Sequence, residues 1–205
     1  MEKAAVFEET YHEYLEQIAT LDLPKLQDIL GIDIQGDEAV IPLYHTRYRV
    51  SSSGIVDEKG KKPRLSVCVI LCKYLLMCPE AIPAASGLAT FKDFKDAGPL
   101  IQFFDNTVQG DVARSFGGNV AALEDACTRL GGTPVEDDWS YQVKYCFSGL
   151  PRVPVYFLFN DEEEGFPAQC TMLFERRAEA FLDMESVAML AGSLTSMLRR
   201  FAGKP

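Results

Sequence analysis

Apolar positions near the end of the chain follow the period of two that is typical of β-strands. One face of residues 153–159 is built only from the apolar side chains of Val153, Val155, Phe157 and Phe159. The other face carries Tyr156 and Leu158, so it is apolar as well. A strand that is apolar on both faces belongs inside a sheet. Residues 141–147 alternate in the same way, and a further strand follows residue 168, so residues 141–174 are predicted to form a three-stranded meander.

Apolar residues spaced three and four apart predict helices at both ends of the chain. The first runs from Ala4 to about Thr20, with Phe7, Tyr11, Tyr14 and Ile18 on its stripe. The last is capped by Asp183 and has the apolar stripe Val187, Leu190, Leu194, Met197 and Phe201. Residues 65–77 are apolar nearly all round, which predicts a helix buried at the centre of the fold.

Shorter elements complete the prediction. Residues 23–30 and 120–130 should be helices capped by Asp22 and Asn119, residues 175–182 a short helix, and residues 32–41 a hairpin. Residues 79–118 show no clear period. Strands in runs with helices before and after predict a single α+β domain over residues 1–205. Its sheet should be mainly antiparallel, with the meander packed by flanking helices around one buried apolar helix.

Residues 44–50 predict a strand with one cationic face. His45, Arg47 and Arg49 would project together, opposite Tyr44, Thr46, Tyr48 and Val50. Arg holds carboxylates and phosphates with paired donors, so this face is a candidate site for an anionic ligand. The simpler interpretation is an exposed polar sheet face whose charges are balanced by carboxylates such as Asp33 on the preceding hairpin.

The loop after residue 160 carries four consecutive carboxylates, which belong to Asp161, Glu162, Glu163 and Glu164. Hard cations such as calcium take oxygen ligands, which makes this loop a possible acidic site. The alternating pattern of an EF-hand loop is absent, however, and a run of charges in a turn is usually just solvated. We therefore expect no metal there.

Cys68 and Cys72 are four residues apart and would share one face of a helix, with Cys78 following shortly after. Iron–sulfur and zinc sites favour closer spacings, such as two intervening residues. Because cysteine is also a common buried side chain, we interpret these thiols as core residues rather than ligands.

The net charge of −10, from 30 acidic and 20 basic residues, changes the range of expected partners. Such a surface repels phosphate backbones and anionic membranes, so we expect neither nucleic acid nor a membrane as partner. The first residues do not resemble a signal peptide, and the apolar run of residues 65–77 is shorter than the ~20 residues of a bilayer span. These features predict a cytoplasmic protein with reduced thiols.

Several short segments are similar to those of a known family. They are Gly131-Gly132, Leu-Pro-Arg-Val-Pro at 150–154, Asp-Glu-Glu-Glu-Gly-Phe-Pro-Ala at 161–168, Met-Leu-Phe at 172–174 and Asp-Met-Glu at 183–185. Over residues 7–198 the chain resembles the bacterial and archaeal family catalogued as Domain of Unknown Function 3786, from which it departs by Glu164 and Gly165, inserted before Phe-Pro. The resemblance implies anaerobic organisms and a setting of low-potential redox or corrinoid chemistry, because some members are fused to a small iron–sulfur cluster domain. It implies no established activity.

Catalytic motifs are scarce. The chain has two histidines and lacks the Gly-x-Ser-x-Gly, His-Glu-x-x-His, Walker and Gly-x-Gly-x-x-Gly patterns, so we lean against an enzyme. We expect an accessory or binding module for a small anionic ligand or a protein partner. The alternative is an enzyme or metallocofactor-handling protein that uses the acidic loop or the thiols of Cys68, Cys72 and Cys78, and the cofactor stays unknown.

Overall fold

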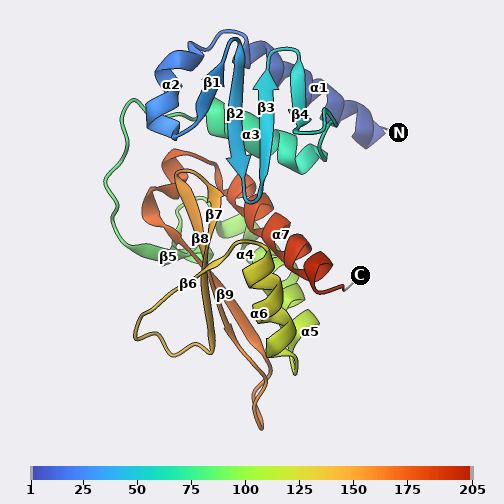
Figure 1. Ribbon diagram of the computed structural model, residues 1–205, viewed down its shortest axis with the longest axis vertical. Coiled ribbons are helices and arrows are strands. Elements are labelled where there is room, and N and C mark those ends of the chain that lie inside the picture. Colours follow the sequence, from blue (N-terminus) through green and yellow to red (C-terminus); the bar gives the residue numbers. More distant parts are fainter. Residues whose placement is uncertain (1, 204–205) are drawn as a thin grey trace.

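A computed structural model describes the backbone of residues 2–203 and the side chains of residues 9–203. It shows two antiparallel sheets at opposite ends of the long axis, with α7 crossing between them (Figure 1). The α-helices are α1 (Glu2–Ile18), α2 (Leu23–Leu30), α3 (Leu65–Leu76), α4 (Ile101–Phe103), α5 (Gly110–Phe116), α6 (Val120–Arg129) and α7 (Met184–Phe201). The predicted stripe positions Ala4 and Phe7 lie outside the described side chains. In the part of the chain that is described, no helix has both the length and the apolar character of a membrane span.

The N-terminal sheet has the strand order β1-β2-β3-β4. Its strands are β1 (Asp33–Gln35), β2 (Glu38–Leu43), β3 (Thr46–Ser51) and β4 (Gly54–Asp57). Leu43 pairs with Thr46, so Tyr44 and His45 form the turn between β2 and β3. The prediction of a strand from residue 44 was therefore wrong at its start. A left-handed backbone at Tyr44, with φ of 53°, makes the turn, and the Tyr44 hydroxyl anchors it by donating to the Leu190 carbonyl at 2.8 Å.

The C-terminal sheet has the order β5-β9-β8-β7-β6. Its strands are β5 (Leu88–Thr90), β6 (Thr133–Pro134), β7 (Val143–Leu150), β8 (Val153–Asn160) and β9 (Gln169–Glu175). The predicted meander is confirmed as β7, β8 and β9. Strand β8 is buried on both faces as predicted, since Phe157 is 0% and Leu158 1% exposed.

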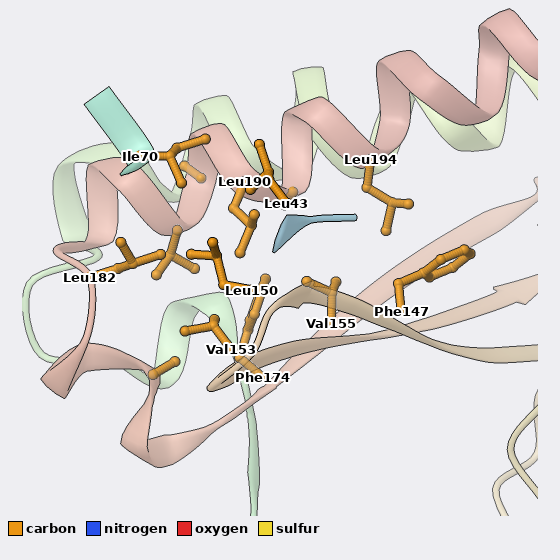
Figure 2. Packing of buried hydrophobic residues seen from close by; sticks show 14 of the residues in the cluster. Leu43, Ile70, Phe147, Leu150, Val153, Val155, Phe174, Leu182, Leu190 and Leu194 are labelled. Carbon is orange, nitrogen blue, oxygen red and sulfur yellow. The ribbon is translucent and has the colours of Figure 1, made fainter. Parts of the chain in front are cut away.

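The long C-terminal helix joins the two sheets into one core. Leu190 and Leu194 of α7 lie over Leu150 and Val155 of the meander, with Leu43 of β2 nearby (Figure 2). Helix α3 contacts both α7 and α1. Its buried residues are Cys68, Ile70, Leu71, Cys72, Tyr74 and Leu75. The apolar run thus forms the buried helix that the sequence predicts.

Two of the three predicted helix caps are confirmed. The side chains of Asn119 and Asp183 accept the backbone N–H groups of Ala122 and Ser186, at 3.3 and 2.8 Å. Asp22 was predicted wrongly, because its carboxylate forms an ion pair with Lys25 at 2.6 Å instead of a cap. The helix expected over residues 175–182 is a 3₁₀ segment at Arg176–Ala180.

Residues 91–116, which showed no clear period, form a helical run that changes its winding. Two 3₁₀ turns (Phe91–Asp93 and Gly98–Leu100) precede α4, a π-helix (Phe104–Gln109) and α5. A side chain from α7 supports the wide π-helical turn, since the Thr195 hydroxyl donates to the Val108 carbonyl at 3.1 Å. A helix that changes from 3.0 to more than 4 residues per turn leaves no constant apolar period to detect.

Gly132 permits a close approach between the end of α6 and β7. A Cβ atom there would lie 2.7 Å from Cε1 of Phe147, whose ring is 1% exposed and has no room to move. Replacing Gly132 with Ala should therefore lower the free energy of unfolding by about 1–3 kcal/mol, as overpacking does. Denaturant unfolding measures this. Gly98→Ala is the control because no heavy atom lies within 4 Å of its Cβ position, and equal losses in both variants would contradict the close contact.

Candidate functional site: the α7 groove

A groove of about 1260 Å³ runs along α7. Four separate parts of the chain line it, namely β3 with its preceding turn, the loop of residues 57–64 with the start of α3, the segment of Leu100 and Phe103, and the outer face of α7. We call it the α7 groove. Its apolar floor consists of Tyr48, Val67, Leu100, Phe103, Met189 and Met197.

Small residues on α7 leave space for this floor. Ser193 and Ser196 face the groove, and their hydroxyls donate back into their own helix, to the carbonyls of Met189 and Gly192 at 2.8 and 2.9 Å. Those hydroxyls are therefore engaged within the helix, and the groove surface beside them is largely apolar. Phe103, on α4, remains 50% exposed although it borders the same hollow.

The rim of the groove is cationic. Six lysines and arginines line it against three carboxylates, those of Asp57, Glu58 and Glu185. The cations are Lys59, Lys61, Lys62, Arg64, Arg199 and Arg200. In a chain with a net charge of −10, this local excess of positive charge contrasts with the whole molecule.

Four of the six cations have no carboxylate partner among the described residues. Lys62 lies over the Tyr11 ring at 4.4 Å, and Arg199 pairs with Asp111 at 3.6 Å. Lys59, Lys61, Arg64 and Arg200 form no ion pair with any residue of the described part of the chain. Cations that line one groove repel one another, and a bound anion would reduce this repulsion.

The fold of the 57–64 loop directs its lysines outward. The Asp57 carboxylate accepts the backbone N–H groups of Lys59 and Lys61, at 2.9 and 2.8 Å, and Gly60 turns the chain with φ of 75°. These two hydrogen bonds to the Asp57 carboxylate hold the loop together. The lysine side chains of the loop are exposed and line the groove. The following helix α3 has Arg64 at its N-cap position, no side chain that caps it and no acid in its first turn, so its N-terminus adds positive potential.

Of the three predicted cationic residues His45, Arg47 and Arg49, only His45 lines the groove. Its ring packs edge-on against Phe201, with centroids 5.7 Å apart. Burial and the nearby Arg200 charge lower the pKa of His45, so the imidazole is neutral at pH 7.

The structure places Arg47 and Arg49 away from the groove. Arg47 pairs with Asp33 at 3.7 Å and Arg49 with Glu38 at 3.8 Å, both on the surface of the N-terminal sheet. Both arginines therefore have carboxylate partners, as the simpler interpretation of the sequence expected. The turn separates them from His45, and an anion site made by these three residues stays a prediction.

The acidic loop forms the connection between β8 and β9. The Asp161 carboxylate accepts the backbone N–H groups of Gly118 and Glu162, at 2.7 and 2.9 Å, and so fixes the base of this loop. Glu162, Glu163 and Glu164 are exposed. Among the described residues, no group of three or more His, Cys, Asp or Glu side chains is arranged to hold a metal ion.

Two thiols of the sequence prediction, Cys68 and Cys72, lie on the core side of α3, and Cys78 follows this helix. Cys68 and Cys72 are 0% exposed and Cys78 is half-buried. Burial raises the pKa of the Cys72 thiol to about 12 and also raises that of Cys78. Since the thiolate is the nucleophile and the metal ligand, these environments disfavour both roles.

The family model for DUF3786, a domain of unknown function, matches residues 22–197. The chain belongs to this family. Neither the curated proteins nor the solved structures gave a match. Two of the segments that carry the DUF3786 resemblance have structural roles here, because Gly132 admits Phe147 and Arg152 donates to the last carbonyls of α2.

The sequence analysis missed the lysines and arginines of the groove, because alternation singled out only His45, Arg47 and Arg49 as cationic candidates. A signal was present, since four of the six residues 59–64 are lysine or arginine in an otherwise acidic chain. Arg200 could not be assigned, because only folding brings the end of α7 to His45.

Proposed function

We propose that this DUF3786 protein is a cytoplasmic binding module whose α7 groove holds an anionic ligand with an apolar part, and that it performs no chemistry of its own. The observation that carries this proposal is a set of cations around an apolar floor, Lys59, Lys61, Arg64 and Arg200, that have no ion partner among the described residues. Sites of this kind bury the apolar part of a ligand and use a few charged groups to orient it.

The charge of the whole protein makes such a groove selective. A net charge of −10 repels anions in general, so an anion is held only where local cations outweigh that field. The screening length is about 8 Å at physiological ionic strength, and therefore the nearest charges dominate within the groove. A ligand with an apolar part also gains from covering Phe103 and the methionines of the floor.

The chemistry of the lining supports binding rather than catalysis. The serine hydroxyls of α7 donate to helix carbonyls, and the imidazole of His45 packs against Phe201. A nucleophile needs an adjacent base within hydrogen-bond reach, and no serine of the groove has a hydrogen bond to His45 in the described part of the chain. The alternative roles in metal or thiol chemistry find less support, given the buried thiols and the solvated acidic loop.

The proposal can be tested with 8-anilinonaphthalene-1-sulfonate, a fluorescent probe that combines one sulfonate with aromatic rings. The wild type should bind it with enhanced fluorescence, and Lys61→Gln/Arg64→Gln should weaken binding about tenfold, equivalent to about 1.4 kcal/mol. The measurement is a fluorescence titration at fixed ionic strength, with circular dichroism to confirm the fold.

The matched control is Arg47→Gln/Arg49→Gln, which also removes two positive charges but from outside the groove. It should bind the probe like the wild type. Equal affinity in all three proteins would contradict the proposal, and a loss confined to the control would move the site to the cationic strand. A thermal-shift screen of anionic metabolites with the same proteins would then identify the ligand class, since only ligands of the native state raise its stability.

A further inference from the structure

We propose that the occupant of the α7 groove is the acidic hairpin tip of a second copy of this chain, so that the protein associates head to tail. The hairpin tip is the β8–β9 turn at residues 162–166. This inference rests on the proposed function, because it uses the same groove and the same cations.

The hairpin tip is a tight, ordered turn. The N–H of Glu163 donates to the Phe166 carbonyl at 3.0 Å, and the N–H of Phe166 donates to the Glu163 carbonyl at 2.8 Å. Gly165, with φ of 84°, forms the corner. Since Glu163 and Phe166 oppose each other in an antiparallel pair, their side chains lie on the same side of the hairpin. An ordered turn loses little conformational entropy when it binds.

The side chains of the tip lack partners within the described part of the chain. Phe166 is 71% exposed, more than the other large apolar side chains at the surface, Phe103 and Ile82. Glu162, Glu163 and Glu164 precede it in the same turn, and none of them forms an ion pair with a described residue. An exposed aromatic ring among three uncompensated carboxylates is suited to a partner with an apolar floor and a cationic rim.

The α7 groove has those two properties. Phe166 would lie on Met189, Met197 and Phe103, where ring and thioether contacts are favourable. The carboxylates of the tip would face Lys59, Lys61 and Arg64. Charges of both signs that lack ion partners among the described residues of one chain would then neutralise each other between two chains.

A chain's own tip lies too far from its groove for an internal contact. The β8–β9 hairpin ends beyond α5 and α6, at the opposite end of the molecule from β3 and α3 (Figure 1). The contact therefore joins two copies through different surfaces, and the pair keeps a free groove on one copy and a free tip on the other. Such heterologous contacts extend into chains unless the geometry closes a ring. Salt screens charges that lie more than about 8 Å apart, which weakens the general repulsion between two copies of net charge −10. The charges in direct contact at the tip and the groove therefore determine whether two copies associate.

Two variants of the full chain test this directly by sedimentation velocity. The tip variant is Glu162→Gln/Glu163→Gln/Glu164→Gln/Phe166→Ser, and the groove variant is Lys61→Glu/Arg64→Glu. The wild type should show a sedimentation coefficient that rises with concentration and falls when salt is added. Each variant alone should remain a monomer. An equimolar mixture should form dimers and nothing larger, because only one tip and one groove remain intact.

A monomeric wild type, or a mixture of variants that stays monomeric, overturns the inference. The sulfonate probe separates this failure from that of the proposed function. Suppose that the chain stays monomeric, and that the tip variant and the wild type bind the probe while the groove variant does not. The groove then binds anions, and its occupant is a separate ligand. If the groove variant binds the probe as well as the wild type does, the proposed function fails together with the inference.

Discussion

Replacing Phe157 with Ala should lower the free energy of unfolding by about 3–5 kcal/mol, the usual loss for an aromatic side chain deleted from a core. Phe157 lies in the middle of β8 with β7 and β9 on either side, and its side chain is 0% exposed. Its ring meets that of Phe147 edge to face, with centroids 6.2 Å apart. Alanine would leave a cavity that the strands on both sides cannot close. Urea unfolding followed by circular dichroism measures the change.

The matched control for this deletion is Phe166→Ala, which removes the same ring from a 71% exposed position. Its effect on stability should be within about 0.5 kcal/mol, as for other surface substitutions. A loss below about 1 kcal/mol for Phe157 would mean that the ring is not enclosed by the meander, and it would contradict the topology of the C-terminal sheet.

The parts of the fold that the sequence predicted are those governed by local periodicity. Strand β8 is apolar at every second position on both faces, and the structure buries both faces. The caps at Asn119 and Asp183 also depend on residues only three apart. Periodicity failed at Tyr44, where a polar and apolar alternation continues through a turn. A contact with Leu190, 146 residues away in sequence, anchors that turn, and no local pattern records such a contact.

The candidate site was predicted less well because it is assembled from distant segments. Strand β3, the 57–64 loop and α7 meet only in the folded chain, and each looks ordinary by itself. Alternation drew attention to Arg47 and Arg49, yet it could not show that Asp33 and Glu38 already balance their charges. Whether a cation has a partner is decided by tertiary contacts, and this property distinguishes Lys61 and Arg64 from Arg47 and Arg49.

Replacing Arg152 with Met should lower the free energy of unfolding by about 2–3 kcal/mol, since hydrogen bonds from a charged donor contribute more than neutral ones. The guanidinium donates to the carbonyls of Ile29 and Asp28, at 2.9 and 2.7 Å, which are among the last of α2. A cation at this end of a helix also opposes its negative pole. Methionine keeps much of the apolar stem, so the loss isolates the hydrogen bonds and the charge.

The buried Tyr74 hydroxyl belongs to the same network. It donates to the Leu30 carbonyl at 2.6 Å and accepts the backbone N–H of Arg152 at 3.1 Å. The effects of Tyr74→Phe and Arg152→Met on the free energy of unfolding should therefore be non-additive, with a coupling of about 0.5–2 kcal/mol in a double-mutant cycle.

The control for Arg152→Met is Arg47→Met, which removes an exposed ion pair worth about 0–1 kcal/mol. If Arg152→Met cost no more than this control and the cycle showed no coupling, water would satisfy the carbonyls of α2. The arginine of the Leu-Pro-Arg-Val-Pro segment would then need an explanation other than fastening α2 and α3 to the turn between β7 and β8.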